Sequence, residues 1–155
     1  MDKTLQHINS ENLTGYRKEL VEKAKSAALK AYAPYSNFKI GAAVLMSDGQ
    51  IYTASNQENA AFGECICAER VTLLYATANN PDVAPKAMAI AAINNGSFTE
   101  QIITPCGACR QVFAEMEKRY KSPIELILYS TNESVLVNSA ADLLPLSFSY
   151  GIMEQ

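Results

Sequence analysis

The chain has 155 residues, of which 48% are hydrophobic, and carries a formal net charge of −3 at pH 7. This length and composition predict one domain with a substantial core, and the weakly acidic balance, without a cluster of Lys and Arg, argues against a nucleic-acid partner. The absence of any apolar run of signal-peptide or membrane-spanning length favours a cytoplasmic protein with no membrane partner.

The N-terminal third of the sequence predicts a helix followed by a pair of strands. Residues 1–13 are polar and are expected to form a flexible extension, which leaves 14–155 as a single catalytic domain. Apolar side chains recur at helical spacing over 14–32, up to Pro34. The apolar runs 38–46 and 51–55 flank Asp48-Gly49, a dipeptide typical of a β-hairpin.

The rest of the chain alternates between helical and extended patterns. Helices are expected over 68–78 and 106–120, with a short last one over 140–144; strands are expected over 87–93, 124–129 and 135–138. Strands separated by helices favour parallel pairing in the later part of the sheet. The predicted fold is therefore α/β, a three-layer α/β/α sandwich on a mixed five-stranded sheet.

Two short motifs at predicted helix starts bring together three thiols and a carboxylate. They are Cys67-Ala68-Glu69-Arg70 and Pro105-Cys106-Gly107-Ala108-Cys109. Three thiolates fill three corners of the tetrahedron that Zn²⁺ prefers and leave the fourth for water, as in a catalytic zinc site. We expect one Zn²⁺ per chain, held by Cys67, Cys106 and Cys109.

The remaining cysteine, Cys65, has two interpretations. It is either a fourth ligand, which would close the site and make the zinc structural, or a small buried apolar residue. The second is favoured because a closed site has no place for water.

The motif pair is the signature of zinc-dependent deaminases. The chain resembles the cytidine deaminase family, specifically its short, homotetrameric branch, over roughly residues 16–150. Further motifs that carry the resemblance are Tyr35-Ser36-Asn37-Phe38, Gly41-Ala42-Ala43, Asn56-Gln57-Glu58-Asn59-Ala60, Arg110-Gln111 after the second cysteine pair, and Leu143-Leu144-Pro145.

The resemblance implies a role for each residue beside the metal. Glu69 is expected to be the catalytic proton shuttle, and Arg70 is expected to donate hydrogen bonds to ligand sulfurs and offset their charge. An ordinary helix-start glutamate and a solvated helix arginine are the alternatives.

The resemblance also implies a set of substrate contacts. Asn56 and Glu58 are expected at the ribose 3′-hydroxyl, Phe38 as an aromatic wall of the nucleoside pocket, and the backbones of Ala68 and Pro105 at the base. Without the resemblance, Asn56 and Glu58 would be interpreted as loop residues and Phe38 as a core residue.

The implied reaction is hydrolytic deamination of cytidine and deoxycytidine to uridine and deoxyuridine with release of ammonia. An alternative is a deaminase of a non-ribose cytosine compound of the blasticidin S type. A structural-zinc interaction module would need Cys65 as its fourth ligand.

The resemblance finally implies a homotetramer in which an aromatic side chain near one C-terminus packs on the base in a neighbour's active site. Phe148 is placed for that role, although an isolated surface phenylalanine is the alternative. Phe62 stands where many relatives have a tyrosine, so any hydrogen bond between subunits made by that hydroxyl is absent here.

Overall fold

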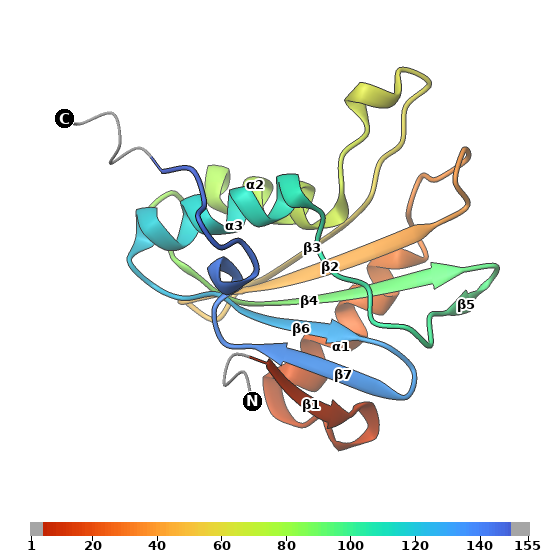
Figure 1. The fold of residues 1–155 in the computed structure, drawn as a ribbon, viewed down its shortest axis with the longest axis horizontal. Coiled ribbons are helices and arrows are strands. Elements are labelled where there is room, and N and C mark those ends of the chain that lie inside the picture. Colours follow the sequence, from red (N-terminus) through yellow and green to blue (C-terminus); the bar gives the residue numbers. More distant parts are fainter. Residues whose placement is uncertain (1–4, 150–155) are drawn as a thin grey trace.

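The computed structural model describes residues 5–149, which form a mixed sheet with helices on both faces (Figure 1). The strands are β1 (Leu5–Asn9), β2 (Lys39–Met46), β3 (Ile51–Ser55), β4 (Pro85–Asn94), β5 (Ser97–Phe98), β6 (Glu125–Tyr129) and β7 (Glu133–Val137). The longer helices are α1 (Gly15–Ala28), α2 (Ala68–Asn79) and α3 (Gly107–Tyr120). Three-residue 3-10 helices span Ser10–Asn12 and Phe62–Glu64, and a four-residue one spans Ala140–Leu143.

Within the described residues the sheet has seven strands in the order β1-β7-β6-β4-β2-β3, with β5 paired to β4. Strands β2 and β3 form the expected antiparallel hairpin, and its turn is fixed by Gly49 at a φ of 89° and by Asp48, whose carboxylate accepts from the Gln50 N–H at 3.0 Å. Strands β4 and β6 are parallel, because α3 carries the chain across one face between them. The predicted three-layer mixed sandwich is confirmed, but the expected strand number of five is wrong, because β1 and β5 extend the sheet to seven strands in the described residues.

Strand β2 has no polar face because both of its faces are covered. Ala42, Val44 and Met46 pack in the core beneath α2 and α3, whereas Ala43 and Leu45 face the core beneath α1. A strand buried on both faces has a continuous apolar sequence, as 40–46 does.

Helix α1 lies unusually close to β2 at Gly41. A Cβ atom built at Gly41 would overlap the backbone of Ala24 and Ala28. Helix α1 presents Leu20, Val21, Ala24, Ala27 and Ala28 to the sheet, and these mostly small side chains allow the approach. The helix ends at Ala28 rather than at residue 32.

The expected flexibility of residues 1–13 is wrong for the described part of that segment. Strand β1 pairs antiparallel with β7 in a register that runs from Leu5↔Val137 to Asn9↔Glu133. Its side chains are exposed except for the half-buried Ile8, which packs against the core, so no hydrophobic pattern marks the strand. Backbone pairing and a 2.8 Å contact between His7 Nδ1 and Glu133 Oε1 hold it to β7. The Ser10 hydroxyl donates to the Ser130 carbonyl at 2.7 Å, and Leu13 is buried in the core under α1.

The two-residue strand β5 was also not expected. It extends the sheet where the chain turns at Asn95 and Gly96, both at positive φ, and pairs back onto the end of β4. None of the helices in residues 5–149 is long and apolar enough to cross a membrane.

Candidate metal centre and active site

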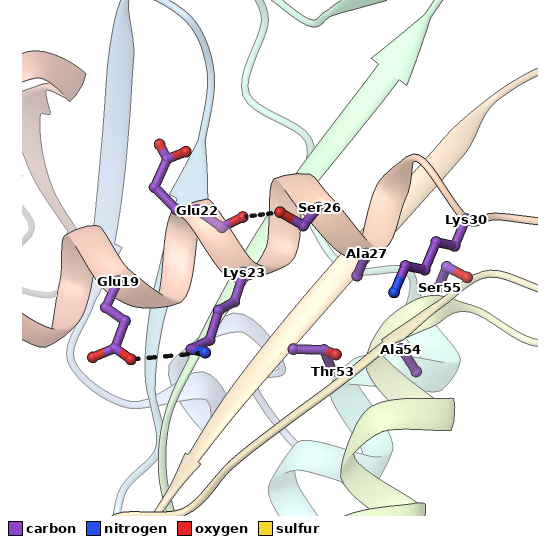
Figure 2. Close-up of a pocket in the computed structure, with 9 residues that line it drawn as sticks. All are labelled: Glu19, Glu22, Lys23, Ser26, Ala27, Lys30, Thr53, Ala54 and Ser55. Atoms are coloured by element: carbon purple, nitrogen blue, oxygen red, sulfur yellow. Dashed lines mark hydrogen bonds and ion pairs between the residues drawn. The ribbon is translucent and has the colours of Figure 1, made fainter.

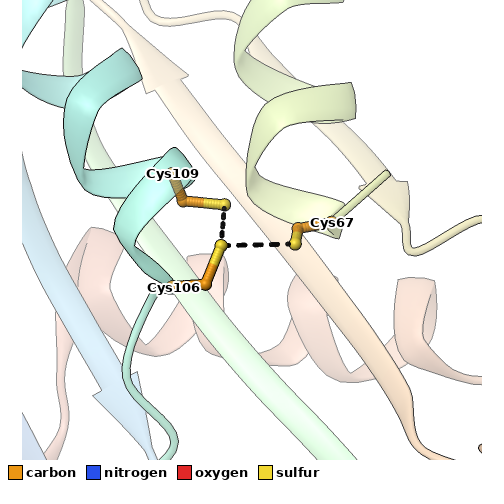
Figure 3. Close-up of side chains that lie close together, drawn as sticks. All are labelled: Cys67, Cys106 and Cys109. Carbon is orange, nitrogen blue, oxygen red and sulfur yellow. Dashed lines mark hydrogen bonds between the residues drawn. The ribbon is translucent and has the colours of Figure 1, made fainter. Parts of the chain in front are cut away.

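Two helix N-termini meet at a cluster of three cysteine sulfurs (Figure 3). Cys67 is the N-cap of α2, while Cys106 is the N-cap of α3 and Cys109 lies in its first turn. The Sγ atoms of Cys67 and Cys106 are 3.6 Å apart, those of Cys106 and Cys109 are 3.5 Å apart, and all three lie within 4.8 Å of one another. One turn of α3 places Cys106 and Cys109 on the same side, facing Cys67.

The sulfur spacing fits a zinc ion. With Zn–S bonds of about 2.3 Å, two sulfurs at corners of a tetrahedron lie about 3.8 Å apart. The two short separations match this value. The cluster therefore provides three ligands of a tetrahedral zinc site, in agreement with the sequence.

The electrostatics of the thiols also call for a cation. The pKa of Cys67 is lowered to about 5 by the hydrogen bond from Cys109, and further by the one from Arg70. The pKa of Cys109 is raised, first because its thiol donates to Cys67 and next because it is buried. A metal ion bound to the sulfurs would offset the added negative charge and favour the thiolate form of each ligand.

Arg70 lies at the cluster rather than in solvent. Its Nη2 is 3.7 Å from the Sγ of Cys67, and this hydrogen bond raises the arginine pKa. Its Nε is buried and has no partner among the described residues. The guanidinium thus places a positive charge beside the Cys67 sulfur.

Glu69 is the buried carboxyl of the site. It is only 4% exposed, in the first turn of α2, and its Oε2 has no hydrogen-bond partner in the described chain. Burial raises the pKa of this carboxyl to about 7. A buried polar atom without a partner is costly, so an unpaired oxygen beside a metal cluster is typical of a group that acts on a bound molecule.

Cys65 is separate from the three-sulfur cluster. Its sulfur accepts a hydrogen bond from the Asn59 N–H at 3.3 Å and donates to the Asn59 carbonyl at 3.7 Å. The interpretation of Cys65 as a fourth ligand is therefore wrong. The three-ligand cluster leaves one coordination position for water.

A small cavity of about 120 Å³ adjoins the cluster. Its lining is made of Ile40, Asn56, Gln57, Glu58, Cys65, Ile66 and Cys67. The structure thus brings the expected sugar-binding pair, Asn56 and Glu58, to the same cavity as a metal ligand.

The side chains of Asn56 and Glu58 are held by neighbouring backbone. Asn56 accepts from the Ile40 N–H at 2.8 Å and donates to the Phe38 carbonyl at 3.0 Å. Glu58 accepts from the Tyr35 N–H at 2.8 Å and from the Ser36 hydroxyl, and the latter bond lowers the pKa of Glu58. Each group is fixed in orientation and keeps spare hydrogen-bonding capacity for a ligand.

The structure does not bring Phe38 or Phe148 to this cavity. The half-buried Phe38 ring lines a separate cavity of about 450 Å³ with residues of the 94–103 segment. Phe148 is 62% exposed, and its backbone carbonyl accepts from Gln111 Nε2 at 3.0 Å. Within one chain neither aromatic ring covers the metal cluster.

The two backbone groups expected at the base lie beside the metal ligands. Ala68 is the first residue of α2, where a backbone N–H has no acceptor within the helix. The Pro105 carbonyl, immediately before Cys106, accepts from Arg110 Nε at 2.8 Å. Sequence reasoning did not assign a role to Arg110.

A larger cavity lies on the opposite side of the sheet. It measures about 560 Å³ and is bounded by α1 and β3 (Figure 2). Its charged side chains are Glu19, Glu22, Lys23 and Lys30, and Lys23 Nζ lies 3.8 Å from a Glu19 oxygen. Its two acidic and two basic side chains balance in charge, and its lining has no sulfur or imidazole that could bind a metal. The larger cavity is therefore not the one beside the candidate metal centre.

Comparison with known proteins places the chain in a family. Residues 15–121 match the family model described as "Cytidine and deoxycytidylate deaminase zinc-binding region". The chain is 37% identical over 131 residues to a cytidine deaminase from Sporosarcina psychrophila. The aligned region covers 84% of this chain and 90% of that protein. A cytidine deaminase from Halalkalibacterium halodurans is 44% identical over 101 residues, 64% of this chain and 71% of that protein.

Solved structures agree with the fold. The crystal structure of cytidine deaminase from Burkholderia pseudomallei aligns with 88% of this chain and 100% of that one, at 41% identity and a TM-score of 0.71. The crystal structure of cytidine deaminase from Mycobacterium tuberculosis aligns with 88% of this chain and 99% of that one, at 31% identity and a TM-score of 0.67. The chain therefore belongs to the cytidine and deoxycytidylate deaminase zinc-binding family.

Proposed function

We propose that the protein catalyses hydrolytic deamination of cytidine and deoxycytidine to uridine and deoxyuridine, with release of ammonia, as a step of pyrimidine salvage. The observation that carries the proposal is the buried, unpartnered carboxyl of Glu69 beside the three-thiol cluster. An open zinc site with an adjacent proton-transfer group is the combination that this reaction needs.

When bound, zinc supplies an activated water for attack on C4 of the pyrimidine. Glu69 accepts a proton from that water and passes it to the ring nitrogen next to C4. It then takes the proton of the hydroxyl group formed at C4 and delivers it to the amine, which departs as ammonia while C4 becomes a carbonyl. A carboxyl with its pKa near neutrality performs both halves of this transfer. Arg70 keeps the Cys67 ligand as thiolate throughout.

The sugar-binding pair favours a nucleoside substrate. Asn56 and Glu58 present amide and carboxylate groups to the cavity that reaches Cys67, which is a matched set for ribose hydroxyls. None of the residues that line this cavity is a lysine or arginine, so nothing there favours a phosphate. A deaminase of the blasticidin S type remains the alternative, because it would use the same metal cluster and Glu69.

The size of the cavity supports an assembly in which active sites are shared. A volume of about 120 Å³ is well below the 300 Å³ or more of ordinary small-molecule sites, so one chain encloses only part of a nucleoside. Exposed Phe148 and Leu146 offer apolar surface near the described end of the chain. These features support a homotetramer in which Phe148 of one subunit packs on the base held by another. Reduced metal-bound thiols also fit a cytoplasmic location.

The test is the loss of ultraviolet absorbance when the protein is incubated separately with cytidine, deoxycytidine and blasticidin S. We expect turnover of both nucleosides and none after zinc has been removed with a chelator. Glu69→Gln should retain zinc, because all three ligands are intact, and should lower kcat by about 10²- to 10⁴-fold. Turnover of blasticidin S alone would select the alternative, and near-normal activity of Glu69→Gln would remove Glu69 from the mechanism.

A further inference from the structure

Arg110, the residue after the metal ligand Cys109, joins two segments of the chain. Its Nε donates to the Pro105 carbonyl at 2.8 Å, and its Nη1 donates to the Leu143 carbonyl at 2.9 Å. A longer contact of 3.4 Å connects Nη2 to the Thr104 hydroxyl. The guanidinium is half-buried, and its donors point in three directions from one rigid plane.

Two of these acceptors immediately precede a metal ligand. Thr104 and Pro105 form the end of the loop that enters α3 at Cys106. Proline has no N–H, so its carbonyl is the one backbone hydrogen-bonding group with which this residue can be anchored from outside. By holding that carbonyl from the first turn of α3, Arg110 fixes the angle at which the chain reaches Cys106.

The third acceptor belongs to the C-terminal part of the chain. Leu143 is the last residue of the 3-10 helix Ala140–Leu143, where carbonyl groups lack partners within the helix. Gln111, the next residue of α3, donates to the Phe148 carbonyl at 3.0 Å. The first turn of α3 thus carries the metal ligands on one side and holds the 143–148 segment on another.

We infer that Arg110 is a positioning residue of the active site, which couples the metal-ligand loop at Pro105 to the C-terminal segment at Leu143. The inference rests on the proposed deaminase function for its kinetic consequence, but not for the coupling itself. Arg110 acts through the Pro105 backbone and the direction of the C-terminal segment. It does not contact the three-sulfur cluster in the described structure.

The same helix provides a matched control. Arg119 lies in the last turn of α3, and its Nη2 donates to another proline carbonyl, that of Pro81, at 3.3 Å. Arg119→Ala therefore removes the same kind of hydrogen bond from the same helix, far from the metal ligands. Comparing it with Arg110→Ala separates an effect on the site from a loss of helix anchoring.

The experiment compares Arg110→Ala, Arg110→Lys and Arg119→Ala in the zinc-loaded, full-length protein. We expect each variant to keep its zinc, and Arg110→Ala to lose about 10- to 100-fold in kcat/KM per bound zinc, the usual effect of removing an outer partner of a metal site. Arg110→Lys should remain impaired, because one ammonium does not span acceptors on both segments. Guanidinium ion, well below unfolding concentrations, should partly restore Arg110→Ala only.

A second readout does not depend on catalysis. Backbone hydrogen exchange over 143–149 should accelerate in Arg110→Ala and Arg110→Lys and stay unchanged in Arg119→Ala. If the wild-type protein fails to deaminate cytidine, the proposed function is wrong, and this exchange experiment still decides the coupling. Wild-type kcat/KM per zinc in both Arg110 variants, or unchanged exchange over 143–149, would overturn the inference.

Discussion

The guanidinium of Arg70 donates to the sulfur of Cys67 across 3.7 Å. Arg70 lies in the first turn of α2, three residues after Cys67, which is the N-cap of that helix. A formal charge of −1 remains when three thiolates bind Zn²⁺, and a cationic hydrogen-bond donor at a ligand sulfur offsets it. This relationship connects the helix-start sequence Cys67-Ala68-Glu69-Arg70 to the chemistry of the metal.

Replacement of Arg70 with Gln should weaken zinc binding by about 10- to 100-fold, because the variant lacks the positive charge that favours the Cys67 thiolate. Competition with a chromophoric chelator measures this affinity. Arg17→Gln is a control, since Arg17 pairs with Glu125 at 2.6 Å on β6 and does not belong to the cluster. Equal affinities for wild type and Arg70→Gln would show that the arginine does not support the ligand set.

The zinc content of single-cysteine variants should distinguish the three ligand cysteines from Cys65. Single replacement of Cys67, Cys106 or Cys109 with Ala should lower the content below one ion per chain and reduce thermal stability, because the ion joins the starts of α2 and α3. Cys65→Ala should retain full zinc, since that sulfur bonds only to the Asn59 backbone. Metal analysis of the purified variants checks this, and loss of zinc from Cys65→Ala with retention in one of the others would refute the ligand set.

Gly41→Ala should destabilise the protein strongly, because its Cβ would overlap the backbone of Ala24 and Ala28 and force α1 away from β2. We expect a loss of about 3 kcal/mol or more in the free energy of unfolding, or recovery only as aggregated protein. Gly63→Ala is the control, since nothing lies within 4 Å of a Cβ at that position. Chemical unfolding of both variants gives the comparison, and similar stabilities would contradict the close packing of α1.

The elements that sequence analysis predicted are those whose burial leaves an apolar pattern in the sequence. Helices α1, α2 and α3 carry apolar side chains at helical spacing, whereas the strands β2, β4, β6 and β7 are marked by short continuous apolar runs. Strand β1 has no such pattern, because backbone pairing with Val137 to Glu133 holds it while its side chains, apart from the half-buried Ile8, remain in solvent. The two-residue strand β5 is too short to carry any pattern.

In the candidate site too, some residues were predictable from the sequence and others were not. The three ligands were predictable because the two short motifs that carry them are the signature of zinc-dependent deaminases, and the same resemblance implied a role for Glu69. The role of Ser36 in holding Glu58 depends on how two loops meet, and the three acceptors of Arg110 come from two segments far apart in the sequence, 104–105 and 143. Such contacts between distant loops leave no periodic trace in a single sequence.

The last prediction concerns Phe148, whose ring is exposed in one chain while its backbone carbonyl is held by Gln111. If Phe148 completes a neighbour's site, Glu69→Ala and Phe148→Ala should each be impaired as homotetramers. Mixed tetramers would contain some sites with Glu69 from one subunit and Phe148 from another, both intact.

Co-refolding the two variants at equal concentration should therefore recover part of the wild-type activity, whereas each variant refolded alone should remain impaired. Native mass spectrometry establishes that mixed tetramers have formed. The matched control mixes Glu69→Ala with Cys67→Ala: both residues belong to the same chain's metal centre, so no mixed site regains both and activity stays low. Demonstrated mixing of the Glu69 and Phe148 variants without recovery would show that Phe148 does not act across subunits.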